Sequence, residues 1–519
     1  MKKIFSFVLL GTFWLSASPT YAAEFYPKLV INEDIAYKIK LPRYIPPPKT
    51  DDEISMRIRG IGRYLAGIVS DTITDMLWNP ARLPSKSFIS LRVPNRIITS
   101  LPGPLKTRWG ILLEGSYHKS ENEHRDTEPS YHYPYWDYHY TDYLSSGSRY
   151  HSNKTYKGAL LGSKQVTPNT CIGLRLDYHL NPHKSSGERI YRYTRESKYD
   201  GHERLNIRDY IDEHNSADTT SSYSFCIGTL SSIWKSDLEI VLGYKQQKET
   251  GKFLNSGTHT NHEEYTSTHD STTHIDIHND ESEGLANEYD FLNPKIWSLG
   301  LRLSRDITPT STFRTIAVLY SGCGDAQREE KNLDYDYHDY HYSHSDPETS
   351  YVYGDTTELY QEDETILDGD ASILGGFLAL GQEFSVSPQL SAGVGIRISY
   401  ERSEVKLEGT RDEVYDTLTS HSMLKEKDIV RRTYIYLPVG IEYKPIPEIA
   451  LRFGVDIYGF YHFSEKNANG WYNRSEYTDG PNYDLSFGAG YKWRRFKFDI
   501  YTMDIAAVRS WDIEMGYSF

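Results

Sequence analysis

The chain ends in Trp511-Asp-Ile-Glu-Met-Gly-Tyr-Ser-Phe519, a stretch in which apolar and polar residues alternate. Alternate side chains of a β-strand point to opposite faces, so this stretch predicts a strand with one apolar and one polar face. An apolar outer face, a polar inner face and a terminal aromatic residue are typical of the closing strand of an outer-membrane β-barrel. A half-buried strand of a soluble sheet shows the same alternation, so the rest of the chain has to decide between the two.

The amino terminus predicts export. Met1-Lys-Lys is positively charged, residues 4–15 are apolar, and residues 16–23 are small or polar. This order is that of a secretory signal peptide, which we expect to cover residues 1–22 with cleavage after Ala22. No later stretch holds 18 consecutive apolar residues, which excludes a membrane protein built of helices.

The composition fits an exported barrel better than a soluble enzyme. Hydrophobic residues make up 38% of the chain, its mean hydropathy is −0.61, and it contains 44 tyrosines. A barrel wall needs an apolar residue only at every second strand position, so its average hydropathy stays low. The net charge of −15 argues against a nucleic-acid partner. Three widely spaced cysteines do not form a disulfide framework.

From about residue 106 the alternation repeats to the end of the chain. Short turns that contain Pro, Asn, Asp or Ser alternate with long polar segments, as short periplasmic turns alternate with long outer loops in outer-membrane barrels. We therefore predict an all-β, transmembrane antiparallel barrel over 101–519, with long extracellular loops. Its strands, about fourteen, should begin near residues 106, 151, 171, 220, 238, 293, 312, 369, 389, 429, 448, 483, 496 and 508. The long polar segments, which we expect to be loops, cover residues 119–150, 182–219, 249–292, 323–368, 402–428 and 464–481.

Residues 24 to about 100 do not alternate. Asp71 and Asp75 are one helical turn apart, Ile68 and Ile73 supply an apolar side, and Asn79-Pro80 is expected to end any helix here. A compact segment here would fill the lumen of a wide barrel, whereas an extended one would be a periplasmic tail.

The segment Asp71-x-x-x-Asp75-x-x-Trp78-Asn79-Pro80-Ala81 resembles the amino-terminal hatch of the long-chain fatty-acid transporter (FadL-type) outer-membrane proteins. The resemblance implies a plug over residues 23–100, a fourteen-stranded barrel, and passive uptake of hydrophobic, fatty-acid-like molecules. On this resemblance the plug motif consists of Asp71, Asp75, Trp78, Asn79, Pro80 and Ala81. Two features depart from the family: the outer loops are longer, and the expected third strand, 171–181, has no interruption that would open a lateral gap.

Several charged residues fall on the polar side of the alternation and should face the lumen, because charges on the lipid face are costly. They could form salt bridges between wall and plug, or some arginines could grip an anionic substrate group. The lumen-facing candidates are Arg175, Asp177, Arg302, Arg397, Arg452 and Asp456.

Three polar segments are rich in Tyr, His and Asp, namely Tyr131–Tyr143, His259–Asp280 and Leu333–His344. They could cap the mouth of the barrel, bind sugars, or bind metals, although their spacing matches no ordered metal site. A surface adhesin or receptor and a general diffusion porin therefore remain alternatives to the transporter.

We expect a location in the bacterial outer membrane, no enzymatic activity, and no cofactor or metal. The expected partners are outer-membrane lipid and lipopolysaccharide, the barrel-assembly machinery through the carboxy-terminal strand, and a hydrophobic small-molecule substrate.

Overall fold

A computed structural model describes residues 54–93, 96–104, 106–128, 132–133, 138–199, 202–233, 236–269, 272–345, 350–415, 418–468, 471–502 and 511–519. The chain divides into two units, Met1–Ile39 and Lys40–Phe519, and every described residue belongs to the second. The predicted signal peptide lies outside the described residues. Within them, no helix has the length and apolarity needed to cross a membrane.

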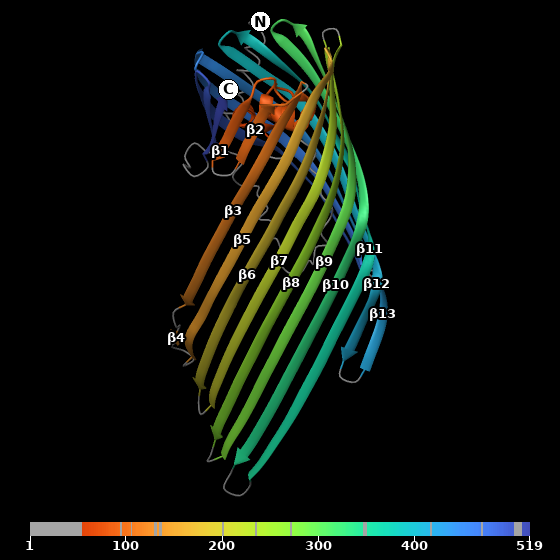
Figure 1. The fold of residues 1–519 in the computed structure, drawn as a ribbon. Helices are drawn as coiled ribbons and strands as arrows, with labels where there is room; N and C mark the ends of the chain where they lie inside the picture. Colours follow the sequence, from red (N-terminus) through yellow and green to blue (C-terminus); the bar gives the residue numbers. More distant parts are fainter. Residues whose placement is uncertain are drawn as a thin grey trace. The chain divides into compact units, whose positions relative to one another are not determined.

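The described chain consists of four short helical turns followed by strands that form one antiparallel sheet (Figure 1). The helical turns are α2 (Met56–Ile61), η2 (Arg63–Leu65), α3 (Thr72–Trp78) and η3 (Pro80–Arg82). The strands are β1 (Phe88–Val93), β2 (Arg96–Pro102), β3 (Thr107–Glu128), β4 (His132–Tyr133), β5 (Tyr138–Thr167), β6 (Thr170–Tyr199), β7 (His202–Ile233), β8 (Ser236–His269), β9 (Thr272–Thr308), β10 (Ser311–Ser345), β11 (Ser350–Ser387), β12 (Leu390–Tyr415), β13 (Leu418–Ile446), β14 (Ile449–Ala468), β15 (Trp471–Trp493), β16 (Phe496–Thr502) and β17 (Asp512–Ser518).

The sheet closes on itself because β1 pairs with both β2 and β17. The two-residue β4 pairs only with β5, so the closed barrel has sixteen strands. The all-β antiparallel barrel is thus confirmed, but the predicted count of about fourteen strands is wrong. The fourteen predicted strands correspond to β3 and β5–β17, and the two additional strands are β1 and β2.

β1 and β2 lie inside the range 23–100 that the sequence assigned to the plug, so the barrel begins at Phe88. They contain only six and seven residues, too few for the alternation to stand out beside the irregular segment before them. β1 pairs with β17, as in Leu91 opposite Met515, and β2 pairs with β1 and β3, so both short strands have the neighbours that they need.

The predicted outer loops are also corrected, because most of their residues continue the strands. β11 contains 38 residues, and its pairing with β10 runs without interruption from Ser311 opposite Phe384 to Ser345 opposite Ser350. Tyr, Thr and Val have high strand propensity, which lets these polar sequences remain paired far beyond the apolar region. The third long strand, β6, runs on through Pro182, which lies opposite Thr219 of β7.

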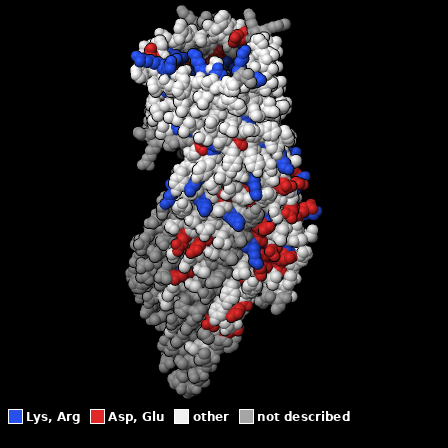
Figure 2. Space-filling model, in the orientation of Figure 1, with Lys and Arg blue, Asp and Glu red and all other residues white. Residues whose placement is uncertain are grey.

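The outside of the barrel carries an apolar belt. On β13, alternate residues Ile435, Leu437, Val439, Ile441 and Tyr443 are 37–46% exposed. Nine residues span about 27 Å along a strand, or about 20 Å of height at the usual tilt, close to the apolar band of outer-membrane barrels. Figure 2 shows the belt as a zone with few blue or red side chains.

The terminal strand follows the predicted alternation. Trp511, Met515 and Phe519 are exposed, and Glu514 between them is buried at 4% exposure. The apolar residues of β17 therefore belong to the outer face, and its carboxylate belongs to the interior.

Residues 54–83, named here the inner segment, lie within the ring of strands. Their partners come from strands around the whole ring: Arg92 of β1, Arg175 of β6, Arg302 of β9, Glu442 of β13 and Asp484 of β15 all bond to the segment. Figure 1 shows its helical turns near the end of the barrel where β1 and β2 lie.

Candidate functional site: the contact between the inner segment and the barrel wall

The Asp71–Ala81 motif is a compact helix with a capping group at each end. The Asp71 carboxylate accepts hydrogen bonds from the amides of Ile73 and Thr74, at 3.1 and 3.0 Å, and so caps α3. Asp75 accepts from the amide of Asp71 at 3.0 Å, which completes a reciprocal cap. Asn79 ends the helix, and its Oδ1 accepts from the amide of Ala81. The predicted end of the helix at Asn79-Pro80 is therefore confirmed, and the structure adds its start at Asp71.

The same residues bond to the wall through a buried charge cluster. Arg302 donates to Asp75 at 2.6 Å and to Glu239 at 2.7 and 3.0 Å. Asn79 donates to Glu239 at 2.9 Å, and Arg82 donates to it at 2.7 and 2.9 Å. Arg302 and Glu239 are almost fully buried, so this cluster joins the inner segment to β8 and β9 with every charge compensated.

Trp78 adds an aromatic contact to that cluster. The Arg302 guanidinium lies over its ring, 4.6 Å from the centroid. Trp78 also belongs to the apolar core that the inner segment forms with the wall residues Ile316, Val318 and Phe377.

A second cluster lies on β13, β14 and β16. Arg57 donates to Glu442 at 3.0 Å, and Arg452 donates to both Glu442 and Asp499 at 2.7 Å. Burial lowers the pKa of Arg57, but the Glu442 carboxylate more than offsets this effect, and the net shift is upward. Arg57 is therefore a permanent cation that links α2 to the wall.

A third cluster lies where the barrel closes. Glu514 of β17 accepts from the amide of Met56 at 3.0 Å, from the Ser90 hydroxyl at 2.7 Å and from Arg96 at 3.0 Å. One carboxylate thus bonds to α2, β1 and β2, so the seam of the barrel and the start of the inner segment share it.

Between the clusters, the segment approaches the wall at inward-facing glycines. A Cβ built at Gly440 or Gly454 would overlap the backbone of Ile61. A Cβ at Gly173 would overlap Pro80 and Ala81, and one at Gly228 would overlap Asn79. These positions admit no side chain while the segment occupies its place, which explains the Gly-rich inner faces of several strands.

The six lumen-facing candidates all lie on the inner side, but their partners differ. Arg302 and Arg452 join the clusters described above. Arg175 pairs with Asp177 at 2.6 Å and donates to the carbonyl of Leu77, and Asp456 accepts from the amide of Arg63 at 3.0 Å.

Arg397 has a different environment. It is 2% exposed, its guanidinium lies 3.7 Å from the centroid of the Phe377 ring, and its Nε and Nη2 have no hydrogen-bond partner among the described residues. Tyr436 packs close by, stacked on Tyr64 of the inner segment at 3.8 Å between centroids. Burial raises the pKa of Tyr64, so this ring remains a neutral phenol.

Sequence reasoning did not identify the wall carboxylates Glu239, Glu442 and Glu514 or the segment cations Arg57 and Arg82 as one system. The signal was present for Glu239, which stands between the outward residues Leu238 and Ile240 of a strand crossing the belt. An inward acid in such a strand requires a buried cation.

No group of three or more His, Cys, Asp or Glu side chains arranged to hold a metal occurs among the residues that the structure describes. Most side chains of Tyr131–Tyr143 and His259–Asp280 lie outside that set.

Comparisons with known proteins give distant similarities. No family model matches the chain, and no curated protein matches it. Among solved structures, the toluene transporter TodX of Pseudomonas putida is 12% identical, with 90% of this chain and 97% of that chain covered and a TM-score of 0.32. A ferric enterobactin receptor (PfeA) of Pseudomonas aeruginosa is 8% identical over 84% and 82% of the two chains, with a TM-score of 0.21. The translocator domain of the autotransporter NalP of Neisseria meningitidis is 10% identical over 84% and 89%, with a TM-score of 0.18. These values assign the chain to no family.

The geometry nevertheless defines a site. A segment of short helical turns fits inside a closed barrel and is bonded to the wall by charge clusters, close glycine contacts and an apolar core.

Proposed function

We propose that the protein is a channel of the bacterial outer membrane that takes up small hydrophobic molecules passively, and that the inner segment is its plug. The observation that carries the proposal is the set of bonds from residues 54–83 to strands around the ring, inside a barrel with an apolar outer belt. A barrel of sixteen strands is wide enough for an aqueous channel unless something fills it.

The membrane placement rests on the outward side chains. Lipid-exposed strands must be closed into a barrel so that every backbone group is paired, and the sheet closes through β1 and β17. The terminal Phe519 supports recognition by the barrel-assembly machinery, as the sequence predicts.

The hydrophobic substrate is supported by the resemblance of Asp71–Ala81 to the fatty-acid transporter hatch and by the apolar packing of the segment against the wall. Ile68, Val69 and Leu65 line that contact together with the wall glycines Gly381 and Gly393. A plug held partly by apolar contacts can exchange them for contacts with an apolar ligand.

Deletion of residues 54–83 tests the plug. We expect the variant to form a barrel of the same mobility in cold detergent gels, because β1–β17 remain complete, and its conductance in planar bilayers should rise sharply. A general porin would conduct equally with and without the segment, and that result would refute the plug.

Uptake of labelled oleate tests the substrate class. Cells that carry the gene should accumulate more label than cells without it, and a labelled hydrophilic sugar of similar size should show no difference. Equal oleate uptake in both strains would remove the support for a fatty-acid-like substrate.

A further inference from the structure

Arg397, on the inner face of β12, is a buried cation with two donors that the described residues do not use. It is 2% exposed, and its Nε and Nη2 have no hydrogen-bond partner among those residues. These two groups donate side by side, which is the geometry that binds both oxygens of one carboxylate. Burial takes water away from the guanidinium, and hydrogen bonds to a carboxylate would replace that lost hydration.

The neighbours of Arg397 are aromatic. The Phe377 ring packs against its guanidinium, and Tyr436 of β13 lies directly opposite Arg397 in the sheet. Tyr64 of η2 stacks on Tyr436, with 3.8 Å between the ring centroids and 24° between the ring planes. The Arg63 guanidinium lies 5.0 Å from the centroid of the Tyr64 ring. We name the place that this ring fills, against Tyr436 and near Arg397, the Tyr64 slot.

Further aromatic side chains follow Tyr436 along the inner wall. Asp456 of β14 accepts a hydrogen bond from the first amide of η2, so its side chain faces inward. Alternation puts Tyr458 and Phe460 on the same face of β14, and Tyr434 on the same face of β13 as Tyr436. The centroids lie 5.7 Å apart for Tyr434 and Phe460, 5.9 Å for Tyr434 and Tyr436, and 6.1 Å for Tyr436 and Tyr458.

The row of rings continues to β15, where the Tyr477 ring lies 5.6 Å from that of Phe460. We name the whole row the aromatic track, which consists of Tyr436, Tyr458, Tyr434, Phe460 and Tyr477. All of its members except Tyr436 are half-buried or exposed. The track covers two steps of alternate residues, about 13 Å along the strands. On the proposed membrane placement, it leads from the outer side of the lumen to the Tyr64 slot.

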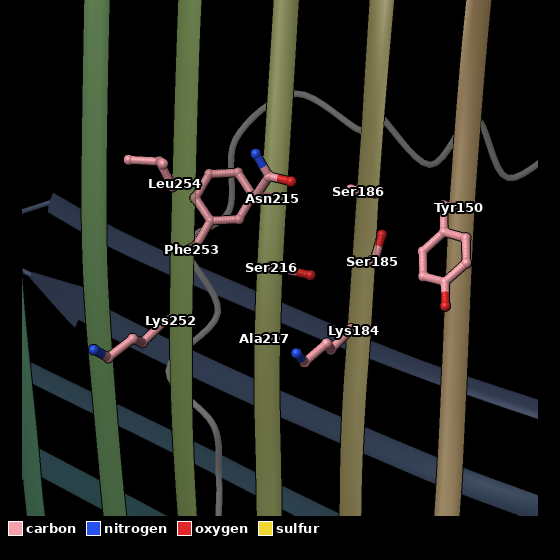
Figure 3. A pocket seen from close by; sticks show the side chains of 10 residues that line it. All are labelled: Tyr150, Lys184, Ser185, Ser186, Asn215, Ser216, Ala217, Lys252, Phe253 and Leu254. Atoms are coloured by element: carbon pink, nitrogen blue, oxygen red, sulfur yellow. The ribbon is translucent and has the colours of Figure 1, made fainter. Parts of the chain in front are cut away.

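A hollow of about 450 Å³ at β5–β8 differs from the Tyr64 slot in the state of its charges. Figure 3 shows its lining residues, among them Tyr150, Lys184 and Lys252. Both lysines are exposed, so water can solvate their charges. Arg397 is buried, and its surroundings therefore point to an anionic ligand more strongly than the hollow does.

We propose that the Tyr64 slot is a binding site for aromatic carboxylates, and that Tyr64 holds the place of the ligand's ring. The incoming ring stacks on Tyr436 in place of Tyr64, and its carboxylate accepts hydrogen bonds from Nε and Nη2 of Arg397. This inference rests on the proposed channel function and names one class among its small hydrophobic molecules. Because Tyr64 belongs to η2, its displacement loosens the inner segment.

The test uses the full chain in lipid nanodiscs and isothermal titration calorimetry, with empty nanodiscs as the background. The ligands are 2-naphthoate, its neutral counterpart 2-naphthamide and the aliphatic octanoate. The unaltered chain should bind 2-naphthoate about tenfold more tightly than 2-naphthamide and about fivefold more tightly than octanoate, since each of the latter lacks one contact. Arg397→Met should lower the affinity for 2-naphthoate about tenfold and change that for 2-naphthamide less than about twofold.

Tyr64→Ala separates a competing ring from a merely structural one. Its affinity for 2-naphthoate should rise about tenfold, because the ligand no longer has to displace the ring. Truncation of a side chain that only supported the site would weaken binding instead. The matched control is Tyr483→Ala on the outward side of β15, opposite Ile457, which should change the affinity less than about twofold. Mobility in cold detergent gels shows whether each variant forms the barrel.

Equal affinity of the unaltered chain for 2-naphthoate and 2-naphthamide would overturn the role of Arg397, and equal affinity for 2-naphthoate and octanoate would overturn the aromatic class. Unchanged or weaker binding by Tyr64→Ala would overturn the role of Tyr64, and no saturable binding by either chain would overturn the site. These results are separable from the channel proposal. A plug deletion that raises conductance, together with no preference for 2-naphthoate, would leave the channel and remove the site.

Discussion

Arg302 and Arg397 are both buried arginines on inward-facing strand positions, yet they have opposite surroundings. Arg302 is held by two carboxylates, Asp75 and Glu239, at 2.6–3.0 Å. Arg397 lies on the Phe377 ring, and its Nε and Nη2 lack partners among the described residues. The free energy of a buried charge depends on such compensation more than on burial itself.

The change Arg302→Met is expected to lower the free energy of unfolding by about 3–5 kcal/mol, because the buried Asp75 loses its cation and Glu239 keeps only Arg82 as a cation. Arg397→Met should cost much less or should stabilise, because no described carboxylate loses a partner. Urea unfolding of the reconstituted barrel, followed by gel mobility, measures both. If the two variants lost equal stability, the charge cluster would not be holding the segment.

Sequence alone placed all six lumen candidates on the inner side, since alternation fixes the face of a strand residue. It could not assign their partners. Asp75 and Arg302 are 227 positions apart, and only the register of the closed sheet brings them together.

At the scale of elements, the inner segment depends on the wall. α2 and α3 contain six and seven residues, fewer than the roughly 12–15 that an isolated helix needs in water. Their caps satisfy the ends, but the free energy that holds them comes from wall contacts. Gly440 and Gly454 permit close contacts between the wall and the backbone of Ile61.

A leucine at position 440 should displace Ile61 and loosen the segment. We expect the Gly440→Leu channel to conduct more than the parent, with an intact barrel. The matched control is Gly158→Leu on the outward side of β5, where the nearest atom to an added Cβ is 4.0 Å away. Unchanged conductance of Gly440→Leu would show that the segment tolerates the side chain without moving.

The motif Asp71–Ala81 predicted a helix and its end at Asn79-Pro80, because proline acts locally, but the start of the helix at Asp71 was not predicted. The extent of the segment was overestimated. Residues 88–102 belong to the wall, and the sequence did not show this because the partners of β1 on β17 lie more than 400 residues further along the chain.

At the scale of the whole barrel, the apolar belt is what the bilayer requires. Val439 stands at the middle of the row of outward residues on β13, and it is 37% exposed in the absence of lipid. Leu418, at the outer end of the same strand, is 73% exposed and lies beyond the belt.

Val439→Arg is expected to destabilise the barrel in vesicles by about 2–4 kcal/mol, the cost of an arginine on the lipid face near the midplane. Leu418→Arg should stay within about 0.5 kcal/mol, because that position faces water. Equilibrium refolding into vesicles measures both. Equal penalties at the two sites would contradict the placement of the belt.

The fold class followed from the alternation, because a barrel imposes it on every strand. The number of strands and the extent of the loops could not be predicted from the alternation. Two short strands gave too little signal, and the hydrophilic segments looked like loops because nothing in polarity distinguishes a solvated strand from a coil.

The paired strands extend much further past the apolar belt on one side of the barrel than on the other. β11 contains 38 residues, and its pairing with β10 continues to Ser345 opposite Ser350, well past the outward apolar residues Leu374 and Leu378. Among the described residues, β1, β2, β16 and β17 contain only six or seven residues each, so the described barrel strands are shortest at the seam. On the proposed membrane placement, a molecule arriving from outside meets strands that are longest at β10 and β11 and shortest where the chain closes. The described strands therefore leave the shorter approach to the inner segment at the seam.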